Sequence, residues 1–162
     1  MAESGKSEFE QLVQVVRQLR HPTKGCPWDL EQTHESLLKF LVEEAFEFIH
    51  ATELEDDKEM EEELGDVLLQ VLLHSVIAEE DGRFDLESLS KTLREKLIRR
   101  HPHVFNDPNP DIDVSDVVAN WEEIKKEEKA QKNVPKTAIK DSALHNTALR
   151  SAHKIGRKTA KV

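Results

Sequence analysis

The sequence predicts an all-α protein, and three observations support that prediction. Apolar residues recur at intervals of three and four along most of residues 8–131, which is the spacing of one face of a helix. No stretch alternates apolar and polar residues between turn signals, so we expect no strand. The chain has 5 glycines, 6 prolines and no tyrosine, a composition that disfavours a turn-rich β fold. The expected architecture is an antiparallel bundle of about five helices.

The first two helices are marked by signals at their ends. Ser7 and Glu10 form a capping-box pattern ahead of an apolar stripe, and this pattern predicts a helix over residues 8–20. The segment HPTKGCPWD contains two prolines and a glycine and ends that helix. Asp29 is then the expected N-cap of a second helix that runs to about Thr52. Its apolar stripe consists of Leu37, Leu38, Leu41, Ala45, Phe48 and Ile49.

A third helix is expected over about residues 59–80, after a short acidic turn at residues 53–58. Two helices joined by so short a turn pack antiparallel. We therefore expect the second and third helices to form a helical hairpin. The apolar stripe of the third helix consists of Met60, Leu64, Val67, Leu68, Val71 and Leu72.

Two further helices complete the predicted bundle. Asp85 is the expected N-cap of a fourth helix, which carries a leucine at every third or fourth position and ends near Arg100. The segment HPHVFNDPNPDID follows, and its three prolines predict irregular backbone. A fifth helix is expected to begin at Asp113 or Ser115 and to carry Trp121.

The net charge of −10 is unevenly distributed along the chain. Residues 132–162 hold 8 Lys/Arg and 1 Asp, a net +7, so residues 1–131 carry −17. We expect one domain over residues 1–131, followed by a basic tail or linker-like segment that is disordered or only loosely helical. So acidic a body disfavours DNA or RNA as a partner. If the domain acts on a polyanion, it needs bound metals or a few well-placed Lys/Arg.

The sequence shows no signal peptide and no membrane span, and we therefore expect a soluble cytoplasmic protein. The N-terminus MAESGKSEFEQ is polar and unlike a signal peptide. No run approaches the roughly 18 apolar residues of a membrane span, so we expect no membrane partner. Cys26 is the only cysteine and cannot form an internal disulfide.

Two pairs of carboxylates border the apolar stripes of the second and third helices. Glu44 falls within the stripe of the second helix, and Glu47 lies three residues further on. Glu63 and Asp66 repeat this spacing on the third helix. In an antiparallel hairpin the two pairs can face each other across the seam. There they would repel strongly unless a cation were present.

A divalent cation bound by oxygen ligands is the interpretation that fits these carboxylates. Oxygen-only ligands suit Mg²⁺ or Mn²⁺ better than zinc. Solvated surface acids explain either pair taken alone, but two pairs on successive helices favour a metal site. A di-iron bundle requires a Glu-x-x-His motif on each of two helices. Glu47 and His50 provide one such motif and the third helix provides none, so we reject iron.

The carboxylates belong to a longer ordered pattern. Glu43-Glu44-x-x-Glu47, followed by Glu63-x-x-Asp66, resembles the EExxE…ExxD signature of the all-α nucleotide pyrophosphohydrolases. The flanking segments resemble those of the MazG family. They are GCPWD (25–29), QTHESL (32–37), EELGDVLLQV (62–71), EEDGRFD (79–85), KLIRRHPHVF (96–105) and NWEEIKKEEK (120–129). The resemblance covers about residues 8–131, and the ordered set is far more specific than the carboxylate spacing alone.

The resemblance implies a packed helical fold that dimerises, so that a homodimer or higher homo-oligomer completes the bundle around each active site. It implies Mg²⁺, with Mn²⁺ as a substitute, bound by Glu44, Glu47, Glu63 and Asp66. It also implies hydrolysis of a nucleoside triphosphate, with ribose or deoxyribose, to the monophosphate and pyrophosphate. The implied biological setting is nucleotide-pool house-cleaning or alarmone control.

Five further residues are candidates for binding the substrate. Lys96 and Arg100 lie four apart and match positions at which the family binds phosphates. The alternative is a solvated helix end, where cations also favour the helix dipole. Trp121 and Lys125 can stack on a base and reach a phosphate, although a core tryptophan beside a surface lysine explains them equally well. Trp28 either covers the core or lines the base pocket.

Glu43 is a candidate to orient or deprotonate the attacking water, and is equally well explained as a surface acid. The implied reaction is attack of a metal-activated water on the α-phosphorus, with pyrophosphate leaving. Two other function classes stay open: a narrow-specificity relative for dUTP or phosphoribosyl-ATP, and a non-catalytic helical interaction module.

Many bacterial relatives carry two such domains in tandem. The segment SALHNTALRSAHKIGRKTAKV resembles the linker before a second domain.

Overall fold

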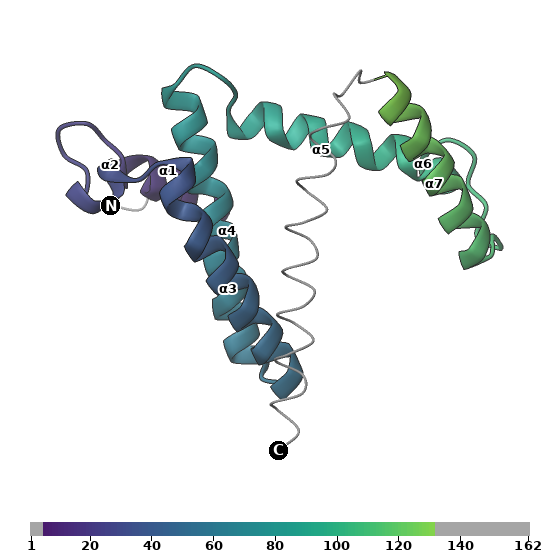
Figure 1. The fold of residues 1–162 in the computed structure, drawn as a ribbon, viewed down its shortest axis with the longest axis horizontal. Helices are drawn as coiled ribbons and strands as arrows, with labels where there is room; N and C mark the ends of the chain where they lie inside the picture. Colours follow the sequence, from purple (N-terminus) through teal and green to yellow (C-terminus); the bar gives the residue numbers. More distant parts are fainter. Residues whose placement is uncertain (1–4, 132–162) are drawn as a thin grey trace. The chain divides into compact units, whose positions relative to one another are not determined.

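A computed structural model of the chain describes residues 5–131, and within this range the regular structure is entirely helical (Figure 1). The all-α prediction is confirmed. The described residues fall into two compact units, one up to Glu95 and one from Lys96 onward. The predicted basic tail, residues 132–162, lies outside them. The helices are α1 (Glu8–Leu19), α2 (Pro27–Glu31), α3 (His34–Leu54), α4 (Asp57–Glu80), α5 (Leu86–Arg100), α6 (Pro102–Phe105) and α7 (Val114–Gln131).

The predicted capping box starts α1. The Ser7 hydroxyl accepts a hydrogen bond from the Glu10 amide at 3.2 Å, and the Glu10 carboxylate accepts one from the Ser7 amide at 2.7 Å. These bonds satisfy two amides at the end of a helix. After α1 the chain turns tightly through Gly25, where a Cβ atom would lie 2.6 Å from the His21 carbonyl oxygen. Only glycine fits this turn without a shift of the backbone.

The prediction of one helix from Asp29 to Thr52 is wrong at its start. The segment instead forms two helices, because the backbone at Gln32 and Thr33 is extended. Thr33 caps α3: its hydroxyl accepts from the Ser36 amide at 3.2 Å, and its amide donates to the Ser36 hydroxyl at 2.9 Å. Asp29 lies buried within α2 and caps no helix.

Arg20 ties α2 to the end of α4. Its guanidinium is buried and donates to the Glu80 carboxylate at 2.9 and 2.7 Å. The same guanidinium donates to the backbone carbonyls of Asp29 and Gln32. This contact fixes the short helix that carries Trp28.

Helices α3 and α4 form the predicted antiparallel hairpin (Figure 1). Glu55 takes the left-handed conformation, with φ of 56°, and reverses the chain. Asp56 then caps α4, since its carboxylate accepts from the amides of Lys58 and Glu59, both at 3.1 Å. This cap starts α4 at Asp57, two residues earlier than expected.

The core of the first unit lies at the end of the hairpin where α1 joins it. Its buried residues are Val16, Leu37, Leu72, Leu73, Val76 and Ile77. Toward the acidic turn the first unit consists of α3 and α4 alone, so apolar residues there remain exposed: Leu54 is 64% exposed, and Leu64 of the predicted stripe is 49% exposed. None of the described helices is long and apolar enough to cross a membrane.

The last three helices follow the predicted order with one difference. Asp85 caps α5 as expected, accepting from the Ser88 amide at 2.7 Å. The segment predicted to be irregular contains the short helix α6, because Pro102 occupies a first helical position, where its missing amide hydrogen costs nothing. Helix α7 starts at Val114, between the two residues predicted to begin it.

Candidate metal centre and substrate-binding residues

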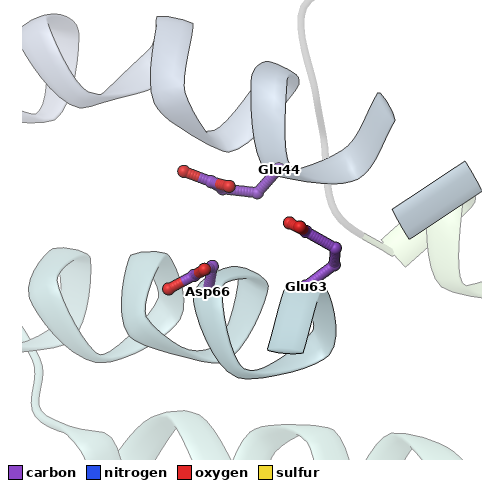
Figure 2. A group of neighbouring side chains, drawn as sticks. All are labelled: Glu44, Glu63 and Asp66. Atoms are coloured by element: carbon purple, nitrogen blue, oxygen red, sulfur yellow. The ribbon is translucent and has the colours of Figure 1, made fainter. Parts of the chain in front are cut away.

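Three of the predicted metal ligands meet between α3 and α4. Glu44 comes from α3, whereas Glu63 and Asp66 come from α4, one turn apart. One carboxylate oxygen of each lies within 4.8 Å of the others. Figure 2 shows the three side chains in the space between the two helices. The antiparallel hairpin therefore brings together carboxylates that are about twenty residues apart in the sequence.

Glu63 and Glu44 are held where the ionised carboxylate is disfavoured. Glu63 is 8% exposed, and its Oε2 atom accepts no hydrogen bond from the described residues. Burial raises the pKa of Glu63 from its usual value, and the nearby charges of Glu47 and Asp66 raise it further. The pKa of Glu44 is also raised, first by burial and then by Asp66 and Glu47.

These residues fit a metal ion. A buried carboxylate oxygen without a partner is costly unless something pairs with it. A cation between the carboxylates would supply that partner and offset their mutual repulsion. The donors are all carboxylate oxygens, the set that hard divalent cations prefer. The close group contains no nitrogen or sulfur ligand of the kind typical of zinc.

Two predicted site residues, Glu47 and Glu43, are not part of the close group of three carboxylates. Glu47 is exposed and lies outside the close group of three, but its charge raises the pKa of both Glu44 and Glu63. Its place as a fourth ligand stays a prediction. Glu43 is exposed on α3 and is not part of the close group. Its role toward a water molecule also stays a prediction.

The second unit holds four of the five predicted substrate-binding residues. Lys96 and Arg100 lie on the last turns of α5, and Trp121 and Lys125 lie on α7. Trp121 is 39% exposed, which disfavours the alternative of a core tryptophan. The Lys125 ammonium lies 5.6 Å from the centroid of the Trp121 ring and 2.7 Å from the Glu122 carboxylate.

The fifth predicted substrate-binding residue, Trp28, lies in the first unit. Its ring is 49% exposed and packs edge-on against Phe40, with the ring centroids 5.6 Å apart. Trp28 thus covers part of the core and also presents a face to solvent.

Sequence reasoning missed Glu128, which binds two arginines of α5. Its carboxylate accepts from Arg99 and from Arg100, each at 2.5 Å. The charge run EEIKKEEK gives no signal for this pairing, because neighbouring charges in the run offer closer partners on the same helix. The signal that does exist is spacing: Glu128 follows Trp121 by seven residues and Lys125 by three, so all three share one face of α7.

A histidine pair at the start of α3 was also not predicted. The Nδ1 atoms of His34 and His74 lie 2.7 Å apart, with the rings nearly parallel and their centroids 5.0 Å apart. Arg83 contacts the Nε2 atom of His34. Arginine can only donate, so Nε2 of His34 accepts and its Nδ1 atom carries the proton. His74 then accepts at Nδ1 and carries its own proton on Nε2, a buried atom without a partner among the described residues.

The fold and the site together define a class: an all-α protein with a carboxylate site for a metal ion between two antiparallel helices. Residues 32–105 match the model of the MazG nucleotide pyrophosphohydrolase domain. The chain belongs to the MazG family. MazG-type pyrophosphohydrolases are metal-dependent in general, in keeping with the acidic cluster.

The chain is similar to several bacterial proteins. It is 52% identical over 124 residues to the nucleoside triphosphate pyrophosphohydrolase/pyrophosphatase MazG of Thermotoga maritima, covering 76% of this chain and 46% of that protein. It is 49% identical over 135 residues to the uncharacterized protein YabN of Bacillus subtilis, covering 83% of this chain and 27% of that protein. The chain thus spans half or less of the length of these two relatives.

The fold is also similar to a solved structure. The crystal structure of a MazG-related protein from Thermotoga maritima matches with a TM-score of 0.61 and 34% identity. The match covers 72% of this chain and 98% of that one.

Proposed function

We propose that the chain hydrolyses nucleoside triphosphates, with ribose or deoxyribose, to the monophosphate and pyrophosphate with Mg²⁺, for which Mn²⁺ substitutes. The observation that carries the proposal is the convergence of Glu44, Glu63 and Asp66, with a buried Glu63 oxygen that lacks a partner. Family membership and the similarity to the nucleoside triphosphate pyrophosphohydrolase of Thermotoga maritima support the same reaction.

Glu44, Glu63 and Asp66 would hold the cation, with Glu47 at the edge of the group. When bound, such a cation supplies positive charge to the phosphoryl oxygens and lowers the pKa of a coordinated water. The raised pKa of Glu63 and Glu44 supports this role, because a nearby positive charge would favour their ionised forms. Glu43, on the exposed side of α3, is the proposed residue to orient the attacking water.

Lys96, Arg100 and Lys125 would neutralise the triphosphate, and the exposed ring of Trp121 would stack on the base. Stacking does not read the edges of a base, so this arrangement suits a broad range of nucleotides. Arg100 presents several donors in a fixed plane, the geometry that matches phosphate oxygens. Trp28 is a second candidate to line the base pocket.

A second copy of the chain is the proposed partner, as a homodimer or higher homo-oligomer. Helices α3 and α4 each leave apolar side chains exposed beside the carboxylate seam. Leu38 and Val42 of α3 are 54% and 39% exposed, and Leu64 and Val71 of α4 are 49% and 37% exposed. A further pair of helices would bury this surface.

The test is incubation of the chain with each NTP and dNTP and Mg²⁺, with products identified by phosphorus NMR. The proposal expects monophosphate and pyrophosphate as primary products. Diphosphate with orthophosphate would refute it. Turnover of dUTP alone, or of phosphoribosyl-ATP alone, would indicate the narrow-specificity alternative. No turnover and no metal requirement would favour a helical interaction module.

A further inference from the structure

Glu128 joins the two helices that carry the proposed substrate-binding residues. Arg99 donates to its Oε1 atom from Nε at 2.9 Å and from Nη2 at 2.5 Å. Arg100 donates from Nη2 to the Oε2 atom at 2.5 Å. These are the ion pairs that connect α5 to α7 within residues 96–131.

The contact is partly shielded from water on the Arg100 side. The side chains of Glu128 and Arg100 are 15% and 19% exposed, whereas that of Arg99 is 52% exposed. Hydrogen bonds from Arg100 and then Arg99 lower the pKa of Glu128 to about 2, so the carboxylate is ionised at neutral pH. Charge-assisted bonds of this kind are stronger than neutral ones.

The geometry leaves part of the Arg100 guanidinium free. Its bonds to Glu128 use Nε and Nη2, and within residues 5–131 its Nη1 group donates no hydrogen bond. A guanidinium is planar and rigid, so holding one edge fixes the direction of the remaining donors. An arginine held in this way loses less conformational entropy when it binds an anion.

The same contact sets the position of α7. Trp121, Lys125 and Glu128 share one face of that helix, and the Trp121 ring lies 6.3 Å from the ring of His101, which follows α5. Fixing Glu128 against the end of α5 therefore also fixes the helix that carries Trp121 and Lys125.

We propose that Glu128 is a positioning residue that holds the guanidinium of Arg100 in one orientation, with its free donors available to a phosphate group. Glu128 acts through Arg100 and contacts no substrate atom. This inference rests on the proposed function, because it requires that Arg100 contacts phosphate.

The test is a double-mutant cycle of Glu128→Ala and Arg100→Ala, each confirmed as helical by circular dichroism. KM and kcat are measured with an NTP, and the Kd of Mg²⁺-pyrophosphate is measured by titration calorimetry. We expect Glu128→Ala to raise KM and Kd about tenfold while changing kcat less than about threefold. Glu128→Asp should recover part of the loss. In the Arg100→Ala background, Glu128→Ala should add little, because the two residues act as a unit.

A matched control is Glu79→Ala. Glu79 pairs with Arg17 at 3.0 Å and is none of the residues proposed to bind metal or substrate. The Glu79→Ala variant should leave the KM for the NTP and the Kd of Mg²⁺-pyrophosphate unchanged. If Glu128→Ala fails to fold, Glu128→Gln takes its place, with the same direction and a smaller effect.

The contrary outcomes separate the two proposals. If Arg100→Ala weakens pyrophosphate binding but Glu128→Ala does not, the positioning role is wrong and the proposed function stands. If Glu128→Ala tightens binding, the carboxylate competes with substrate and the inference is overturned. The inference also fails if the effect of Glu128→Ala persists in full without Arg100, because Glu128 would then only link the helices. If Arg100→Ala changes neither constant, the phosphate role of Arg100 is wrong, and the role of Glu128 falls with it.

Discussion

Glu44 of α3 and Glu63 of α4 bring carboxylate oxygens within 4.8 Å of each other across the seam of a helical hairpin. Burial raises the pKa of both residues, and each feels the charge of the other carboxylates around it. Two acids placed in this way make the seam less stable than a hydrophobic one. A cation bound between the carboxylates would offset their repulsion and stabilise the seam.

The first prediction concerns thermal stability. Mg²⁺ or Mn²⁺ should raise the melting temperature of the wild type, because a ligand that binds only the folded state stabilises it. Glu63→Gln should reduce this metal-dependent increment. Scanning calorimetry with and without metal measures it, and Glu61→Gln is the control, since Glu61 is exposed on the same helix. An equal increment in Glu63→Gln and the wild type would show that the site is misassigned.

The second prediction separates metal binding from substrate binding. Glu63→Ala should lower kcat severely, because it removes a ligand and leaves the remaining carboxylates to repel one another. Arg100→Ala should instead raise KM with a smaller fall in kcat, since its contact is present before the transition state. The loss of one charged hydrogen bond corresponds to roughly 10- to 150-fold in kcat/KM. Near-normal kcat for Glu63→Ala at saturating Mg²⁺ would mean that the carboxylates are surface acids.

The third prediction concerns pH and the histidine pair. Burial lowers the pKa of His74 below its usual 6.5, and the neighbouring His34 lowers it further. The unfolded chain therefore binds a proton at a higher pH than the folded chain does. This contribution to stability is present above about pH 6.5 and declines as the pH falls below it.

Urea unfolding at pH 7.5 and pH 5 measures this effect. His74→Gln should show a smaller loss of stability between the two pH values than the wild type. Nitrogen NMR of the rings should find the proton on Nδ1 of His34 and on Nε2 of His74 near neutral pH. The opposite tautomers would contradict the hydrogen-bond chain from Arg83.

The fourth prediction concerns self-association. The exposed apolar residues of α3 and α4 should be covered by a second copy, so light scattering should give a mass above that of the monomer. Leu64→Glu should shift the mass toward the monomer, because it places a charge in a surface that must be dehydrated. The control variant Glu61→Gln, on the same helix, should leave the mass unchanged. A monomeric mass at every concentration would refute the dimer.

Much of the fold was predictable because its determinants are local. The capping boxes and apolar spacings each involve residues within one or two turns of one another, so the helix ends at Ser7 and Asp85 could be identified from the sequence. The break before α3 could not. Thr33 and Ser36 provide a local cap for α3, but the buried guanidinium of Arg20 also binds the carbonyl of Gln32, and one-dimensional spacing carries no record of that contact.

The sequence by itself predicted the antiparallel hairpin, because the short acidic turn allows no other packing of the two helices, and it placed Glu44, Glu63 and Asp66 at the seam through their i, i+3 spacing. Tertiary structure alone decided that Glu63 is buried with an unpaired oxygen, that a hydrogen bond joins the rings of His34 and His74, and that Glu128 binds Arg100. Each of these depends on the packing of residues that lie far apart in the sequence: His34 and His74 are 40 positions apart, and Arg100 and Glu128 are 28 apart. Burial and electrostatic coupling arise only when such distant side chains are brought together in a low-dielectric environment.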